Sequence, residues 1–199
     1  MIVLDMEMSG TSPTKHSILS IGAVDFLNPE NVYYKECRIW EGAHLMKEAL
    51  AVNGFSEQAC VDLNKITEAE VVRDFFEWAL SAEEHTIAGH NTAFDNWFLI
   101  AAAERAHTNF PLARRTLDLH TACYFHAIRR GIMPPTENGH SGLTSNAVSV
   151  YVGIPKEPRP HNALNGAKQA AECFSRLMHE RTLINDFSEY SIPWLSARV

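Results

Sequence analysis

The chain has 199 residues, 46% of them hydrophobic, and a formal net charge of −7 with its ten histidines counted as neutral. This length suits one well-buried domain and is short for two. The acidic balance excludes a protein that coats DNA through an overall basic surface, but it allows an approach to nucleic acid through bound cations and a small basic rim. The candidate pairs for such a rim, each also interpretable as solvated surface, are Arg114 with Arg115, Arg129 with Arg130, and Lys156 with Arg159.

The four cysteines are far apart in the chain and show no C-x-x-C spacing; they are Cys37, Cys60, Cys123 and Cys173. This pattern argues against a disulfide framework and against a zinc site. The first apolar run is short and is interrupted by Asp5, and no apolar stretch has the length of a membrane span. We therefore expect a cytoplasmic protein that is not associated with a membrane.

The first 40 residues alternate apolar runs with turn-forming residues. Three of these runs predict β-strands, over residues 2–8, 17–26 and 32–40, and the turns fall at 9–14 and 28–31. We expect these strands to form an antiparallel meander. Further along, helical patterns alternate with short strands, which indicates an α/β fold with a mixed sheet flanked by helices.

The middle of the chain predicts two helices that enclose a short strand at residues 86–91. The first helix begins at Thr67, which has the capping-box spacing to Glu70. Its expected buried face consists of Val72, Phe75, Phe76, Ala79 and Leu80. The second begins near Ala93 and carries Asp95 in its first turn, close to the end of the preceding strand. Its apolar stripe consists of Phe94, Phe98, Leu99 and Ala102.

The next part of the chain predicts a strand at Thr116 to Leu119 and a helix that ends near Gly131. The turn-rich segment 131–142 is the expected mobile loop or lid. A shorter helix follows from Leu143 to Gly153.

The Pro-rich run IPKEPRP then leads to His161, and Asn162 is the expected N-cap of the last long helix. The apolar spacing of that helix is kept by Ala163, Ala167, Ala170, Ala171, Phe174, Leu177 and Met178. We expect a single domain over residues 1–182. For the C-terminal tail, residues 183–199, packing on the domain is favoured over contact with a partner.

Asp5 and Glu7 are the most informative residues of the first strand. Side chains alternate along a strand, so both carboxylates point to the same face. Buried carboxylates are costly to desolvate, and such a pair at a strand tip favours metal binding. Asp95 and His161 are expected nearby. Taken alone, Asp95 is equally typical of a helix first turn, and His161 of an ordinary loop histidine.

Hard oxygen ligands suit Mg²⁺ or Mn²⁺, and two such ions can activate water and stabilise a leaving alkoxide in phosphodiester hydrolysis. An imidazole has an unperturbed pKa near working pH, so His161 suits the removal of a proton from the attacking water. This pattern predicts two-metal chemistry on nucleic acid.

Five segments of the sequence resemble the DnaQ-like 3′-5′ exonucleases, in the DEDDh branch of the DEDD superfamily. The segments are LDMEMSG with SILSIGAV, GHNTAFDNWFL, RTLDL and PHNALNGAKQAAECF. The resemblance implies a ribonuclease-H-like fold and release of nucleotides from a 3′ end with two Mg²⁺ or Mn²⁺ ions. It implies metal ligation by Asp5, Glu7 and Asp95, and a general-base role for His161.

The same resemblance implies contacts to the terminal nucleotide from Met8, Ser9, Gly10 and Thr11. His90 and Asn91 are further candidates for substrate binding, and polar residues that only hydrogen-bond loops are the alternative for these two. The implied substrate is DNA or RNA with a single-stranded or overhanging 3′ end. A homodimer, or a polymerase or repair partner, is also compatible with the resemblance.

One position departs from the family pattern: Gly166 stands five residues after His161, where relatives carry an Asp. Loss of a metal ligand predicts impaired activity, because even a partner outside the ligand set typically contributes about 10- to 100-fold. Three explanations stay open: a deliberate inactivating substitution, a natural loss of activity, or a tolerated change in which water or Asn165 fills part of the gap. Asn165 fits least, since it lies about 100° around the helix.

Two rival interpretations follow. The chain can be a pseudo-nuclease that binds nucleic-acid ends or a partner without cutting, or a protein with an acidic patch and no nucleic-acid function. The choice between DNA and RNA depends on contacts to the 2′-hydroxyl that the sequence does not locate.

Overall fold

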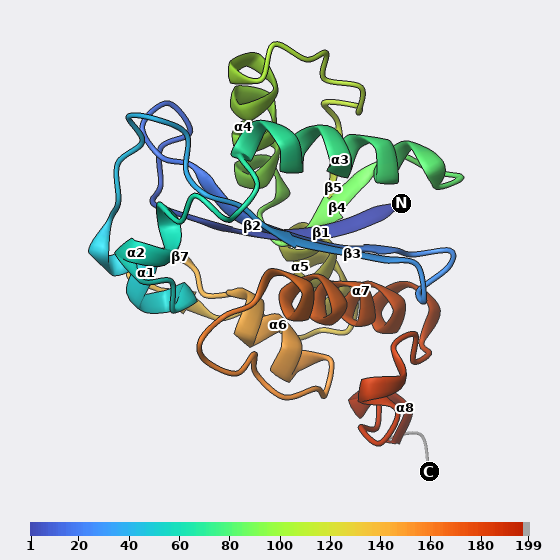
Figure 1. The fold of residues 1–199 in the computed structure, drawn as a ribbon. Coiled ribbons are helices and arrows are strands. Elements are labelled where there is room, and N and C mark those ends of the chain that lie inside the picture. The colour runs from blue at the N-terminus through green and yellow to red at the C-terminus, as the bar shows by residue number, and fades with distance from the viewer. Residues whose placement is uncertain (197–199) are drawn as a thin grey trace.

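A five-stranded sheet forms the centre of the molecule in the computed structural model, which describes residues 1–196 (Figure 1). The strands are β1 (Ile2–Met8), β2 (Ile18–Asp25), β3 (Val32–Glu36), β4 (Ile87–Gly89) and β5 (Thr116–Asp118). Their order in the sheet is β3-β2-β1-β4-β5. The first three strands are antiparallel, whereas β4 and β5 continue the sheet in parallel with β1. The predicted mixed sheet is confirmed.

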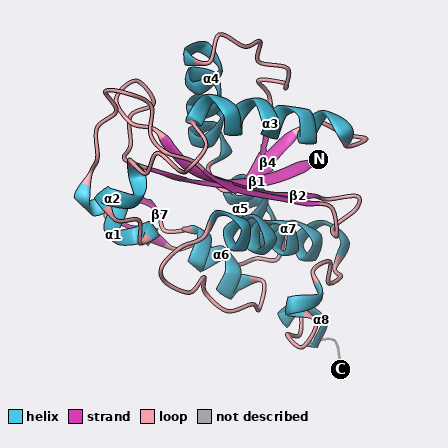
Figure 2. Cartoon of the chain, viewed as in Figure 1, coloured by secondary structure: helices cyan, strands magenta, loops and turns pink. Residues whose placement is uncertain are grey.

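Helices cover both faces of this sheet. Figure 1 shows α3 and α4 on one side and α5, α6 and α7 on the other, and Figure 2 shows the same layers by secondary structure. The helices are α1 (Lys47–Asn53), α2 (Glu57–Cys60), α3 (Glu68–Ser81), α4 (Thr92–Arg105), α5 (Leu119–Arg129), α6 (Ser145–Tyr151), α7 (Ala163–His179) and α8 (Pro193–Ser196). The sheet is thus buried between two helical layers.

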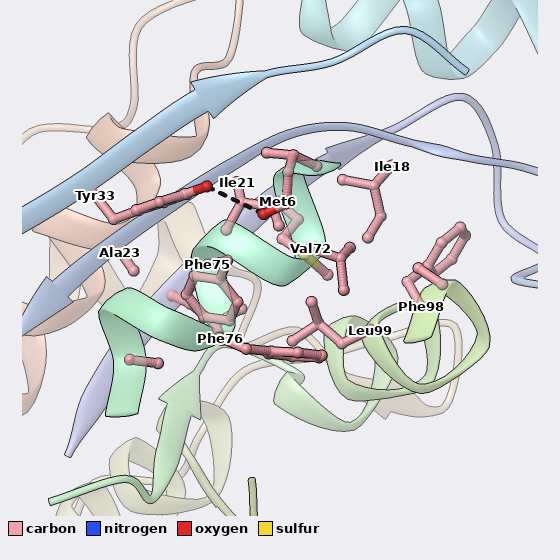
Figure 3. Packing of buried hydrophobic residues seen from close by; sticks show 14 of the residues in the cluster. Met6, Ile18, Ile21, Ala23, Tyr33, Val72, Phe75, Phe76, Phe98 and Leu99 are labelled. Carbon is pink, nitrogen blue, oxygen red and sulfur yellow. Dashed lines mark hydrogen bonds between the residues drawn. The ribbon is translucent and has the colours of Figure 1, made fainter. Parts of the chain in front are cut away.

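The two faces of β1 belong to different hydrophobic cores. Even-numbered side chains enter the core under α3 and α4, part of which is drawn in Figure 3; they are Ile2, Leu4, Met6 and Met8. Met1 and Val3 enter the core under α7. Because side chains alternate along a strand, Asp5 and Glu7 continue the face of β1 that α7 covers.

Two sequence features let α7 approach the sheet closely. The Asn162 side chain caps the helix, with Oδ1 accepting from the amides of Leu164 (3.1 Å) and Asn165 (3.2 Å). Gly22 of β2, which is opposite Asp5 in the ladder, lies directly under the helix start. A Cβ atom at Gly22 would stand 2.1 Å from the backbone carbon of Ala163, so only glycine allows this approach.

Several details differ from the sequence-based prediction. Leu80, which the sequence predicts on the buried face of α3, is 44% exposed, because it lies about 100° around the helix from the buried Ala79. Met178, in the last turn of α7, is 47% exposed. The third strand ends at Glu36 rather than at residue 40. The segment proposed as a lid contains a short hairpin, β6 (Thr136–Glu137) with β7 (His140–Ser141).

The C-terminal segment lies against the α7 layer. Ile184, Phe187, Ile192 and Trp194 are buried in the same core as Val3, and the 3₁₀ turn η1 (Asn185–Phe187) lies within this segment. The last three residues of the predicted tail lie outside the described residues. Over residues 1–196, none of the helices combines the length and apolarity needed to cross a membrane.

Candidate active site

Asp5 and Glu7 sit on β1 beneath the first turns of α7. Glu7 is 8% exposed, and within residues 1–196 its carboxylate has no hydrogen-bond or ion-pair partner. The Asp5 carboxylate is turned toward the helix, where its Oδ2 atom would stand 2.1 Å from a Cβ atom at position 166. Asp5 therefore uses the space that a side chain at Gly166 would need.

Asp95 reaches the same region from the first turn of α4. This helix follows β4, which pairs with β1, and the residue just before it, Asn91, is in the left-handed conformation (φ 57°). Asp95 is 5% exposed, and its ionisation is opposed first by this burial and then by Asp5 and Glu7. The structure therefore brings these three predicted acids together.

His161 immediately precedes the capping residue of α7. Its backbone amide donates to Val52 (3.2 Å), and its Nδ1 lies 3.6 Å from Oε2 of Glu157. The other ring nitrogen, Nε2, is buried and has no hydrogen-bond partner among the described residues. An imidazole held by its Nδ1 side keeps Nε2 available as an acceptor.

A small cavity of about 80 Å³ lies between Asp5 and His161, and neither Glu7 nor Asp95 belongs to its lining. Its lining includes Asp5, His90, Glu157, His161 and Gly166. The Nδ1 atom of His90 is likewise buried without a partner, so two imidazoles and two carboxylates face one enclosed space.

The carboxylates oppose one another's ionisation. Burial raises the pKa of Asp5 to about 7, with a further contribution from Glu157. Burial raises the pKa of Glu7 to about 8, and Asp5 and then Glu157 add to it. Burial also raises the pKa of Asp95 and of Glu157, although the Asn162 amide and His161 act in the opposite direction on Glu157. Such a cluster is most stable as an ionised set when a cation neutralises it.

The donor set suits a hard divalent cation, since it offers carboxylate oxygens, and burial raises the pKa of Cys173, the cysteine that also lines the cavity, to about 12 and keeps it a thiol. The unpartnered Glu7 carboxylate and His161 Nε2 agree with this chemistry. Within residues 1–196, however, no three His, Cys, Asp or Glu side chains are already arranged around one ion position. The side chains would have to reorient on binding, Asp5 among them.

The sequence matches the exonuclease family (RNase T type) over residues 2–174. The chain belongs to this exonuclease family. Ribonuclease T of Shigella boydii serotype 4 (strain Sb227) is 30% identical over 118 residues, which are 53% of this chain and 54% of that protein. Ribonuclease T of Escherichia coli (strain K12) is 29% identical over 118 residues, which are again 53% of this chain and 54% of that protein. The chain thus spans about half the length of the curated relatives that it matches.

Solved structures of exonucleases share the fold. The nuclease domain of 3'hExo, described as a DEDDh family member bound to rAMP, has a TM-score of 0.69 at 14% identity, covering 92% of this chain and 94% of that one. Escherichia coli Exonuclease I in complex with a 5cy-dT13 oligonucleotide has a TM-score of 0.69 at 16% identity. The match covers 90% of this chain and 41% of the Exonuclease I chain. A zinc-bound form of the complex of Exonuclease I with single-stranded DNA has a TM-score of 0.69 at 15% identity. This match also covers 90% of this chain and 41% of the other chain. The ribonuclease-H-like fold predicted from the sequence is confirmed.

The segment expected to contact a terminal nucleotide in this exonuclease fold is largely enclosed. Met8 belongs to the core under α3 and α4, and the Ser9 hydroxyl donates to His44 (2.8 Å) and accepts from the Ser17 amide (2.9 Å). Gly10 is buried and Thr11 is exposed. Contacts from this segment would therefore come from Thr11 and from backbone groups.

The two candidates after β4 differ from each other. His90 lines the 80 Å³ cavity beside Asp5, whereas the Asn91 side chain is exposed at the start of α4. Of the pair, only His90 joins the enclosed site.

Sequence reasoning about this exonuclease site missed Glu157. The residue lies four positions before His161, between Pro155 and Pro158, in a segment with no helical or strand periodicity. The only signal was an acid next to a histidine of interest, which is too common to single out. Its proximity to Asp5 depends on how the loop folds back over α7.

Proposed function

We propose that the chain is a metal-dependent 3′-5′ exonuclease that hydrolyses phosphodiester bonds of DNA or RNA. The observation that supports this most is the convergence of Asp5, Glu7 and Asp95, where Asp5 adds to the effect of burial in opposing the ionisation of the other two, beside a buried His161 Nε2 without a partner among the described residues. A family of exonucleases provides the reaction class.

Asp5, Glu7 and Asp95 would hold two Mg²⁺ or Mn²⁺ ions. When bound, such ions supply neutralisation of phosphate charge and activation of water. Asp5 would provide a carboxylate on the side of the site that α7 covers. Glu7 would provide another, two residues further along the same face of β1. Asp95 contributes from the start of α4.

His161 acts as the general base. Its Nδ1 side faces Glu157, so the lone pair of Nε2 is directed away from that carboxylate and can accept the proton of the attacking water. The water oxygen adds to phosphorus, and the bond to the 3′-oxygen of the preceding nucleotide breaks. That oxygen keeps the electron pair and takes a proton from solvent, which leaves a new 3′-hydroxyl end. A mononucleotide is released.

The substrate is a single-stranded or overhanging 3′ end. This proposal draws on Exonuclease I in complex with dT13 and on the 3'hExo domain bound to rAMP, which leave both DNA and RNA as substrates. Thr11 and backbone groups of residues 8–10 are the proposed contacts to the terminal nucleotide, with His90 and Asn91 nearby. Exposed Lys156 and Arg159, on the loop next to His161, are placed to meet phosphates further along the strand.

The setting is a reducing one, consistent with a cytoplasmic enzyme. All four cysteines are buried free thiols. A homodimer, or a polymerase or repair protein, stays a proposed partner.

Gly166 lowers the rate of this chain without abolishing it. A carboxylate at that position would add a ligand to the α7 side of the site, and losing one should reduce turnover by at least about tenfold. The second candidate function, a pseudo-nuclease that binds ends without cutting, is favoured by the same glycine. It predicts nucleic-acid binding that survives Asp5→Ala, and no hydrolysis even when the acid is restored in Gly166→Asp.

The test is hydrolysis of 5′-labelled DNA and RNA with single-stranded 3′ ends, in Mg²⁺, Mn²⁺ or EDTA. The unmodified chain is compared with Asp5→Asn, Gly166→Asp and, as a control on the exposed side of α3, Glu77→Gln. We expect shortening from the 3′ end that needs the cation, is lost in Asp5→Asn, is unchanged in Glu77→Gln and is faster in Gly166→Asp. Inactivity of both the unmodified chain and Gly166→Asp would exclude the proposed function.

A further inference from the structure

The α7 side of the site contains a carboxylate that the family pattern does not include. Glu157 belongs to the loop between α6 and α7, and its side chain is 8% exposed. It lines the 80 Å³ cavity together with Asp5, His161 and Gly166. Position 166, where relatives carry an acid, therefore shares its cavity with an acid from a different element.

The loop is anchored so that Glu157 points inward. The Glu157 amide donates to Oδ1 of Asn146 (2.9 Å), and Gln169 Nε2 of α7 donates to the carbonyl of Pro155 (3.4 Å). The Glu157 carboxylate in turn accepts from the Asn162 amide at the start of α7 (3.2 Å). These contacts fix the side chain between the end of α6 and the start of α7.

In the described part of the chain, no Lys or Arg side chain pairs with this acid. Among residues 1–196, its only ion-pair partner is His161, at 3.6 Å, and the adjacent Lys156 and Arg159 are exposed without ion pairs. An enclosed carboxylate is costly unless a cation or several hydrogen bonds stabilise it. Glu157 instead lines the same cavity as Asp5, with the His161 imidazole and the Asn162 amide as its polar contacts.

We propose that Glu157 supplies the fourth carboxylate of the cation site in place of the acid missing at Gly166. Gly166 and Glu157 form a matched pair: the glycine leaves room for the Asp5 carboxylate against α7, and the loop brings a replacement acid to the same cavity. Four carboxylates balance the charge of two divalent ions, whereas three leave a net positive site. This inference rests on the proposed function and names a further ligand for it.

A competing role for Glu157 is to orient His161 through Nδ1 without touching a cation. The two roles differ in a measurable way. An orienting residue changes the pH dependence of turnover and leaves cation affinity unaltered, whereas a ligand changes cation affinity even without substrate.

The experiment measures Mn²⁺ affinity of the full chain by electron paramagnetic resonance and calorimetry, in the absence of nucleic acid. The variants are Glu157→Gln, which keeps an acceptor for the Asn162 amide, Glu157→Asp, which keeps the charge, Asp5→Asn and the exposed control Glu77→Gln. Circular dichroism and thermal unfolding in EDTA report whether each variant folds.

We expect Glu157→Gln to bind Mn²⁺ at least about tenfold more weakly, and Glu157→Asp to stay closer to the unmodified chain. Unaltered affinity in folded Glu157→Gln, together with weakened affinity in Asp5→Asn, overturns the role of Glu157 and leaves the proposed function intact. Unaltered affinity in both variants overturns the cation site itself. If Glu157→Gln fails to fold, Glu157→Asp decides: affinity indistinguishable from that of the unmodified chain contradicts the proposal, because a ligand shortened by one methylene group should bind Mn²⁺ measurably more weakly.

Discussion

Asp5 and the glycine opposite it on α7 compete for one small volume. The Asp5 Oδ2 atom would lie 2.1 Å from a Cβ atom at position 166, so an acid there requires Asp5 to rotate. Because Oδ2 is the end of a side chain and not backbone, this adjustment is feasible. The restored Gly166→Asp variant is therefore a sound test, and its effect should depend on whether Glu157 is also present.

A double-mutant cycle between positions 157 and 166 reports this dependence. If both acids serve the same cation, Glu157→Gln should reduce turnover at least about tenfold in the unmodified chain but only about threefold or less alongside Gly166→Asp. Turnover on a single-stranded 3′ end in saturating Mn²⁺ is the measurement. Equal losses in the two backgrounds would show that the residues act independently.

His161 offers a second prediction at this scale. Replacing it by Asn removes the Nε2 base while keeping an amide near Glu157, so turnover should fall by about 10² to 10⁴. Mn²⁺ affinity should change by less than about threefold, because His161 is assigned no cation contact. A variant that turns over normally would refute the general-base role.

Sequence alone was sufficient for residues whose role follows from strand or helix periodicity. Asp5 and Glu7 share a face because β-strand side chains alternate, and Asn162 caps α7 because its side chain satisfies free amides at the helix start. Glu157 could not be found this way. Its place in the cavity depends on side-chain contacts of Asn146 and Gln169 with an aperiodic loop, and on a tertiary approach that no local pattern encodes.

At the scale of elements, the approach of α7 to β2 positions both the capping turn and His161. The N-terminal turn of this helix lies over Gly22, with the Ala163 backbone 2.1 Å from the place of a Cβ atom. Sequence periodicity predicted the buried alanines of α7 but not the need for glycine on the facing strand. It also failed for Leu80 and Met178, since solvent exposure near the C-terminal end of a helix depends on what lies beyond it.

Gly22→Ala tests this packing. The added methyl group meets backbone atoms that cannot rotate away, so α7 must shift, and we expect the free energy of unfolding to fall by about 2 to 3 kcal/mol. Gly142→Ala is the control, since its nearest neighbour would lie 3.3 Å away and its change should be under about 1 kcal/mol. Urea unfolding measures both. Equal stability of the two variants would contradict the close approach of α7 to β2.

At the scale of the whole molecule, the acidic site links stability to pH and to cations. The pKa of Asp5 rises from 3.8 to about 7 on folding, and that of Glu7 from 4.5 to about 8. Between pH about 4 and 8 the folded state therefore binds more protons than the unfolded state. The free energy of unfolding falls as pH rises through this range. A bound cation should offset this loss, because it favours the ionised carboxylates.

We therefore expect the unfolding temperature in EDTA to be at least about 4 °C lower at pH 8 than at pH 6. Asp5→Asn should show a shallower dependence, and Glu77→Gln should match the unmodified chain. Mn²⁺ should raise the unfolding temperature more at pH 8 than at pH 6. Scanning calorimetry across this range is the measurement, and an Asp5→Asn profile parallel to that of the unmodified chain would contradict the linkage.

The convergence of Asp5, Glu7, Asp95 and Glu157 on divalent cations is tested most directly by the anomalous difference density of crystals grown with Mn²⁺. We predict manganese peaks within about 2.5 Å of oxygen atoms of Asp5 and Glu7, with Asp95 and Glu157 completing the ligand set. Density confined to other parts of the surface, or manganese bound elsewhere while Asp5 stays against Gly166, would contradict the account.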